Sequence, residues 1–306
     1  MLRYPERVGR PFLWAHRGAS ASRPDNTLAS FLLAERQGAD GVELDVHLTR
    51  DGVVAVVHDA WVSPVTWRFG HDGSPSAEVR APAADVASGA VRVDLEAGEA
   101  GLRALVHEAV ASRRLVGGMN WPELRGVVRG YDEEGRPLYA PRLEELFEAL
   151  APHTALDIEV KSAPAPYPDL AYPGLLEAVI AIVRRYRAEE RAIISSFDHR
   201  LLRRAAAAAP DIATLAIYHA RLVDVPAMAA TIPTRHVNME VDLASEEDVR
   251  ACHEAGLCVS VGGLTSAEDL ARAARWGADA VTLDDPRWAA EAGLPEAAGA
   301  GIESGR

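Results

Sequence analysis

The sequence lacks the features of a nucleic-acid-binding, membrane-embedded or disulfide-stabilised protein. Its 306 residues include 2 cysteines and 6% aromatic residues, so we expect a core of packed Ala, Val and Leu, with Cys252 and Cys258 as ordinary thiols. No Lys/Arg-rich run occurs and the net charge is −13, which argues against nucleic acid or an anionic membrane as a partner. Without an apolar leader or an apolar run of about 18 residues, we expect a cytoplasmic chain with no integral membrane segment.

Two acidic residues lie two positions apart on a predicted strand. Glu43 and Asp45 fall within 41–46, and the period of two in a strand points both side chains to one face. Two carboxylates that share a buried face repel each other unless a cation joins them. The pattern therefore predicts a metal site.

A second predicted strand, 155–160, carries three charges on one face. Asp157, Glu159 and Lys161 alternate with apolar residues, although a barrel strand is ordinarily apolar because both of its faces are buried. The bland interpretation is a structural ion pair between Lys161 and a neighbouring acid. The functional interpretation places Glu159 beside Glu43 and Asp45 around one hard divalent cation, Mg²⁺ or Ca²⁺, since such cations prefer oxygen ligands.

Cationic and titratable residues stand at the ends of the neighbouring predicted strands. Arg17 and Lys161 are suited to the anionic oxygens of a phosphate. His16 and His58 are candidates for a general acid and a general base. Together with the three acids, these residues predict a catalytic site for a small phosphorylated substrate.

The remaining pattern predicts a single (β/α)8 barrel over residues 1–306. Eight strands are expected, most of them followed by an amphipathic helix, and Asn26 or Thr27 should cap the first helix. The expected strands are 12–15, 41–46, 155–160, 192–196, 214–218, 236–239, 257–261 and 280–283. The segments 38–45 and 277–284 match at six of eight positions, as equivalent barrel units would.

One segment interrupts this alternation. Residues 61–140 are too long for a structureless loop, so we expect a small inserted subdomain after the second βα region, with helices at 102–115 and from Asn120. It would serve either as a cover for the site or as a solvated elaboration. The tail, 293–306, is expected to be frayed.

The chain resembles the glycerophosphodiester phosphodiesterase family in motifs that span most of the predicted barrel. These are His16-Arg17-Gly18, Pro24-Asp25-Asn26-Thr27, Gly38-Ala39-Asp40, Glu43-x-Asp45, Thr49-x-Asp51-Gly52, His58-Asp59, Ile158-Glu159-x-Lys161, Ser195-Ser196-Phe197 and Asp284-Asp285-Pro286. The resemblance implies a metal-dependent barrel that cleaves a glycerophosphodiester to glycerol 3-phosphate and an alcohol. It implies His16 and His58 as the acid/base pair, Glu43, Asp45 and Glu159 as metal ligands, and Arg17 and Lys161 as phosphate contacts.

The sequence departs from this family pattern at two informative places. The family usually has Glu where Asp25 stands, so we expect altered support around His16. It often has a Trp where Gly262-Gly263 stands, so we expect Trp61, Trp67 or Trp121 to replace that wall of the alcohol pocket.

Two other functions remain as alternatives. The segment around Gly262-Gly263 also resembles the phosphate-binding end of biosynthetic barrels, which would suggest an isomerase or lyase. A catalytically silent binding barrel is the third class. The sequence predicts no oligomeric state.

Overall fold

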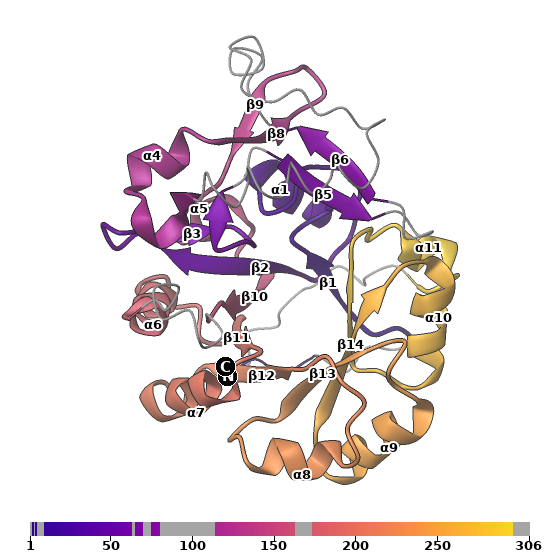
Figure 1. Cartoon of the computed structure of the whole chain (residues 1–306). Coiled ribbons are helices and arrows are strands. Elements are labelled where there is room, and N and C mark those ends of the chain that lie inside the picture. Colours follow the sequence, from indigo (N-terminus) through magenta and orange to yellow (C-terminus); the bar gives the residue numbers. More distant parts are fainter. Residues whose placement is uncertain are drawn as a thin grey trace.

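The computed structural model describes residues 2, 4, 9–62, 65–69, 75–79, 114–162 and 173–295. Within these ranges, eight parallel strands form a closed barrel (Figure 1). They are β1 (Phe12–His16), β2 (Gly41–Leu48), β10 (Ala155–Val160), β11 (Ala192–Ser196), β12 (Ala213–Ile217), β13 (His236–Glu240), β14 (Cys258–Leu264) and β15 (Ala280–Leu283). Each strand pairs with the next, and β1 closes the ring by pairing with both β2 and β15.

A helix follows each barrel strand in the chain, so the predicted (β/α)8 architecture is confirmed. The helices are α1 (Leu28–Arg36), α5 (Leu143–Ala149), α6 (Leu175–Arg185), α7 (His199–Ala208), α8 (Val225–Ala230), α9 (Glu246–Glu254), α10 (Ala267–Arg275) and α11 (Trp288–Glu291). Thr27, and not Asn26, caps α1 by accepting a hydrogen bond from the Ser30 backbone N–H. This leaves the Asn26 side chain free of a capping role.

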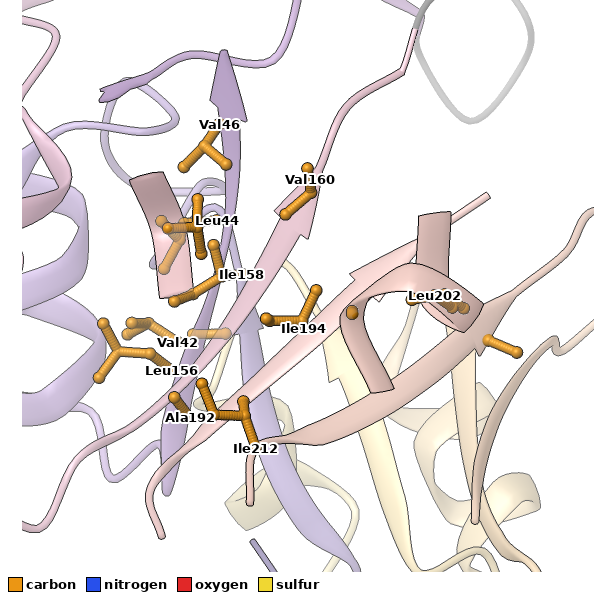
Figure 2. Packing of buried hydrophobic residues seen from close by; sticks show 14 of the residues in the cluster. Val42, Leu44, Val46, Leu156, Ile158, Val160, Ala192, Ile194, Leu202 and Ile212 are labelled. Carbon is orange, nitrogen blue, oxygen red and sulfur yellow. The ribbon is translucent and has the colours of Figure 1, made fainter. Parts of the chain in front are cut away.

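The apolar residues of the strands alternate with the site residues. Val42, Leu44 and Val46 on β2, and Leu156, Ile158 and Val160 on β10, are fully buried in the large core cluster that the helices cover (Figure 2). A smaller cluster fills the barrel interior, where Leu2 and Tyr4 pack against a set of inward-facing residues. That set consists of Phe12, Trp14, Ala155, Ile193, Ala213, Leu215 and Ala280. Because the interior below the site is packed, the cavity is confined to one end of the barrel.

The predicted insert begins after β3 (Val54–Val56), which pairs antiparallel with β2. Its described parts are β4 (Trp61–Val62) paired with β7 (Arg114–Leu115), the β5 (Val65–Phe69) and β6 (Pro75–Val79) pair, η2 (Val116–Gly118), α4 (Trp121–Arg125), and β8 (Val128–Tyr131) paired with β9 (Pro137–Tyr139). Buried Val116, Met119 and Leu124 pack against Ala55 and Val57. The insert is therefore anchored beside β3, while its status as a separate subdomain stays a prediction.

Several sequence predictions fall partly or wholly outside the described residues. The helix expected at 102–115 lies outside them up to residue 113, and its last two residues form strand β7, so the prediction is wrong there.

The helix expected from Asn120 is confirmed as α4, with Asn120 as its N-cap. Cys252 and Cys258 are free thiols. In the described part of the chain, every helix is too short or too polar to cross a bilayer.

Candidate active site

The predicted site residues gather around one cavity of about 380 Å³, built by the carboxyl ends of the barrel strands. Six of the seven line it, namely His16, Arg17, Glu43, His58, Glu159 and Lys161. The seventh, Asp45, is fully buried and contacts Arg17 and Lys161. The carboxyl ends of the strands are where active sites of such barrels form.

Strand register brings the acidic residues together. In the pairing of β2 with β10, Glu43 lies opposite Asp157 and Asp45 lies opposite Glu159. Like charges directly opposite each other on neighbouring strands are destabilising. Oxygen atoms of Glu43, Asp45 and Glu159 lie within 4.8 Å of one another, so the three carboxylates form one cluster with a strong local demand for positive charge.

Two basic side chains neutralise part of the negative charge of this cluster. The Lys161 ammonium lies 2.7 Å from Asp45 Oδ1 and 2.5 Å from Glu159 Oε1. The Arg17 guanidinium lies 3.2 Å from Asp45 Oδ2, and the Arg17 backbone N–H donates to Glu43 Oε2 at 3.0 Å. Both cations thus line the cavity while bound to its acids, so the ion-pair interpretation of Lys161 and its position beside the site are both observed.

The protonation of the cluster follows its burial and its charges. Burial, followed by the charges of Asp45 and Glu159, raises the pKa of Glu43 well above its ordinary value. Burial and the neighbouring Asp45 likewise raise the pKa of Glu159, although Lys161 opposes them. Burial alone would raise the pKa of Asp45, but Lys161 and Arg17 outweigh it and hold that pKa below its usual range. The cluster therefore combines a charged Asp45 with two carboxyl groups, Glu43 and Glu159, that lose their protons less readily than in water, and a bound cation would favour their ionised forms.

Asp157 stands beside the cluster with a different environment. Burial raises its pKa to about 7, against a hydrogen bond that Ser195 Oγ donates to its Oδ1 at 2.5 Å. The sequence had placed Asp157 on the same face as Glu159 and Lys161, and it does line the cavity.

Both histidines are held in the same way. His16 Nδ1 lies 2.7 Å from Asp284 Oδ1, and His58 Nδ1 lies 2.9 Å from Asp59 Oδ1. A carboxylate accepts hydrogen bonds, so each contact fixes the proton on Nδ1 and leaves Nε2 to exchange protons with a substrate. His16 Nε2 lies 4.0 Å from Glu43 Oε2, which sets this nitrogen beside the acid cluster.

The turn after β1 has a strained backbone. Arg17 has φ of 55° and Asn26 has φ of 53°, a left-handed conformation that costs energy for residues other than glycine. At Gly18 (φ 85°) a Cβ would approach Ser30 Oγ to 2.4 Å, so only glycine fits. Two hydrogen bonds of the Asn26 side chain offset part of the conformational cost of this turn. Asn26 Nδ2 donates to Asp45 Oδ2 at 2.8 Å, and Asn26 Oδ1 accepts from the Asp45 backbone N–H at 3.3 Å.

One expectation about the surroundings of the site stays a prediction, and another is wrong in part. The Asp25 carboxylate lies 3.8 Å from Arg17 and 3.8 Å from Arg129, while the Asp284 carboxylate lies against His16 Nδ1, so altered support around His16 through Asp25 stays a prediction. Trp121 packs with the cluster beside β3 and is not among the described residues that line the cavity. The side chains of Trp61 and Trp67 lie outside the described part of the structure.

Sequence reasoning missed the roles of several residues. Asn26 was weighed only as a helix cap, and Asp59 and Asp284 appeared only within motifs, although their carboxylates hold the two histidines. One feature of the sequence could have indicated a role for Asp284: in the alignment of 277–284 with 38–45, Asp284 occupies the position of Asp45, a predicted site residue. The opposite wall, with Asn238, Glu240, Gly262 and Gly263, had no recognisable signal except the glycine pair.

The donor set fits a hard divalent cation. All of the acidic ligand atoms are oxygens within 4.8 Å of one another, which favours Mg²⁺ or Ca²⁺ over softer metals. Asp45 Oδ1 is buried, and its partner is the Lys161 ammonium at 2.7 Å. A buried carboxylate oxygen that already attracts a cationic group is well suited to a metal cation.

The fold and the cavity together define a (β/α)8 barrel with a charged site at the carboxyl ends of its strands. Residues 16–287 match the model of the glycerophosphoryl diester phosphodiesterase family. The chain belongs to this family of phosphoric diester hydrolases.

Individual relatives agree with this assignment. A glycerophosphodiester phosphodiesterase from Caldanaerobacter subterraneus subsp. tengcongensis is 30% identical over 273 residues, which cover 89% of this chain and 93% of the relative. A crystal structure from Silicibacter pomeroyi DSS-3 that carries the same family name is 26% identical, with a TM-score of 0.72, covering 94% of this chain and 96% of that one. An Oleispira antarctica phosphodiesterase in complex with the product sn-glycerol-3-phosphate shares the fold, with 20% identity, a TM-score of 0.69, and coverage of 92% and 96%.

Proposed function

We propose that this protein hydrolyses glycerophosphodiesters to glycerol 3-phosphate and an alcohol, with one divalent cation held by Glu43, Asp45 and Glu159. The observation that carries the proposal is the convergence of these three acids with two carboxylate-bonded histidines on one cavity. When bound, a divalent cation would polarise the phosphoryl oxygens as a Lewis acid. The family assignment and the activity named for the Caldanaerobacter relative support the choice of substrate.

The cavity's basic residues would bind the phosphate. Arg17 presents a guanidinium that can hold two phosphate oxygens at once, and Lys161 presents a point charge. Although burial lowers the pKa of Lys161, the neighbouring Asp45 and Glu159 raise that pKa above its ordinary value. Lys161 therefore carries a positive charge at neutral pH, and together with Arg17 it supplies the positive charge of a cavity that is otherwise rich in acids.

His16 and His58 would move the protons. One takes a proton at Nε2 from the nucleophile, either water or the glycerol hydroxyl beside the phosphate, and the other gives a proton to the leaving alkoxide. Asp284 and Asp59 hold the two rings with Nδ1 protonated, so the ring that acts as the base has an Nε2 free to take a proton, and the ring that acts as the acid would carry a second proton on Nε2, stabilised by its carboxylate. The assignment of acid and base to the two rings stays open.

The arrangement of the glycine pair argues against the isomerase or lyase alternative. At Gly263 a Cβ would lie 2.0 Å from Glu240 Oε2, and at Gly262 it would lie 3.0 Å from Asn238 Nδ2. A carboxylate thus lies where the alternative requires a phosphate monoester, and it would repel that group.

The test is cation-dependent hydrolysis. Activity on a glycerophosphodiester should vanish after chelation and return with added Mg²⁺ or Ca²⁺, while a phosphate monoester stays inert. Glu159→Gln should weaken cation binding, measured directly by calorimetry, by about 10- to 100-fold or more. Asp157→Asn, which alters an acid on the same strand outside the three, is the matched control and should have a smaller effect. Full activity in chelator, with no metal found by elemental analysis, would refute the proposal.

A further inference from the structure

The cavity has a second polar wall on the far side from the acid cluster. β13 lies four strands from β2 in either direction around the barrel, so its inward-facing residues oppose Glu43 and Asp45. Asn238 and Glu240 stand two apart on β13 and both line the cavity. Neither residue belongs to the proposed cation, phosphate or acid/base groups.

The neighbouring glycine pair makes room for these two side chains. Glu240 pairs with Gly262 in the register of β13 and β14. A Cβ at Gly263, which has φ of 68°, would collide with the Glu240 carboxylate, and a Cβ at Gly262 would crowd the Asn238 amide. The missing side chains at 262 and 263 therefore leave this wall polar and carboxylate-bearing.

Within the described structure, one polar group of this wall lacks a partner and another has only a long contact. Asn238 is 7% exposed, and its Oδ1 is buried without a hydrogen-bond partner. The ion pair recorded for Glu240 is a 3.9 Å contact with His219, whose side chain is 75% exposed. A buried, unpaired amide oxygen is costly unless a ligand satisfies it, which indicates that something polar binds here.

An aromatic side chain lies on the same cavity. Phe197 follows β11 at the cavity mouth and is 52% exposed, although most large apolar side chains in the described structure are buried. An exposed aromatic face together with a carboxylate and an amide oxygen is the chemistry that binds ammonium groups. It is poorly suited to a second anion.

We propose that Glu240, Asn238 and Phe197 form the alcohol subsite, and that this subsite selects substrates whose leaving alcohol carries a positively charged ammonium group. The inference rests on the proposed function, because it needs the phosphate to be held beside the acid cluster so that the alcohol reaches across to β13. The cation would lie against the Phe197 ring, beside the Glu240 carboxylate and the negative end of the Asn238 amide.

The test compares two esters of glycerol 3-phosphate that differ only in charge. One has choline as its alcohol, and the other has 3,3-dimethylbutanol, in which carbon replaces the quaternary nitrogen. The ratio of their kcat/KM values should be at least about tenfold in favour of the choline ester, carried mainly by KM, because the ion pair and ring contact act on binding. Glu240→Gln, which keeps the shape and removes the charge, should bring the ratio close to one.

Control variants separate the subsite from the rest of the protein. Asp242→Asn removes the same charge two residues further on, from a side chain that is 85% exposed and contacts Arg272, and should leave the ratio unchanged. Phe197→Leu changes an exposed side chain that folding does not require, and it should also lower the ratio of the two kcat/KM values. This variant tests the subsite even in the case that Glu240→Gln does not fold.

The outcomes also separate this inference from the proposed function. Hydrolysis of both esters at equal rates by the wild-type protein overturns the subsite and leaves the proposed function standing. Preference for the ester of glycerol, a neutral polyol, over that of choline shows a hydroxyl-binding wall and also overturns it. Failure to hydrolyse any of these esters with Mg²⁺ or Ca²⁺ refutes the proposed function, and the subsite with it.

Discussion

Asp284 should contribute to catalysis through His16, and two substitutions separate its charge from its hydrogen bond. Asp284 Oδ1 accepts from His16 Nδ1 at 2.7 Å and from Ser20 Oγ at 2.8 Å. Burial raises its pKa, but the hydrogen bond and charge of His16 outweigh burial and hold the pKa below its usual range. The carboxylate is therefore ionised at neutral pH, where it would stabilise the protonated imidazole that forms during proton transfer.

The size of the effect follows from the kind of hydrogen bond. Asp284→Ala removes a charge-assisted hydrogen bond, typically about 1.5–3 kcal/mol, which corresponds to a loss of roughly 10- to 100-fold in kcat/KM. In Asp284→Asn the amide oxygen can still accept from both His16 and Ser20, so about 1 kcal/mol, or about fivefold, should be lost. The losses should fall on kcat, because Asp284 would act on the reacting histidine and not on substrate binding.

The assay is the pH dependence of hydrolysis for a diester with a poor leaving group. Asp285→Asn is the matched control, since the neighbouring carboxylate pairs with Arg287 at 2.6 Å and does not contact His16. In a His16→Ala background the Asp284→Ala substitution should cost almost nothing further, because the two residues act as one unit. If the two losses simply add, or if Asp284→Ala alone keeps its rate within about threefold, the positioning role is wrong.

Three further predictions concern stability and the cation. Asn26→Ala removes two hydrogen bonds to buried Asp45 and should weaken calorimetric cation binding about 10-fold or more, whereas an unchanged affinity would show that Asp45 needs no such support. Ile158→Ala opens the fully buried β10 core and should cost about 2–5 kcal/mol in urea unfolding, with little change in cation affinity. Burial lowers the pKa of His236 to about 4, so stability should be intact above pH 6.5 and fall by about 2 kcal/mol by pH 5 as the unfolded state takes up a proton. The His236→Phe variant should show a shallower dependence on pH, and an equal slope would refute this.

The sequence predicted the barrel because the alternation of short apolar strands with amphipathic helices is a local pattern. Predicted strands such as 155–160 and 192–196 agree with β10 and β11, since strand propensity and burial coincide there. The insert was harder to predict, because residues 114–115 pair with β4 across about 50 positions of sequence. A helical period over 102–115 carried no information about that long-range pairing.

The seven candidate site residues could be predicted because chemistry restricts which residues stand on an inward strand face. Their partners could not: Asn26, Asp59 and Asp284 gain their meaning from the turn after β1, from the end of β3 and from the closure of β1 on β15. The residues of the wall opposite the acids also depend on strand register. In the sequence, Gly262 and Gly263 show only that two side chains are absent, whereas the pairing of β13 with β14 shows that Asn238 and Glu240 occupy the space. Sequence alone therefore determined which residues carry the charge. Tertiary structure decided which carboxylate faces a cation, which a histidine and which the opposite wall, because those contacts depend on strand register around a closed barrel and not on spacing along the chain.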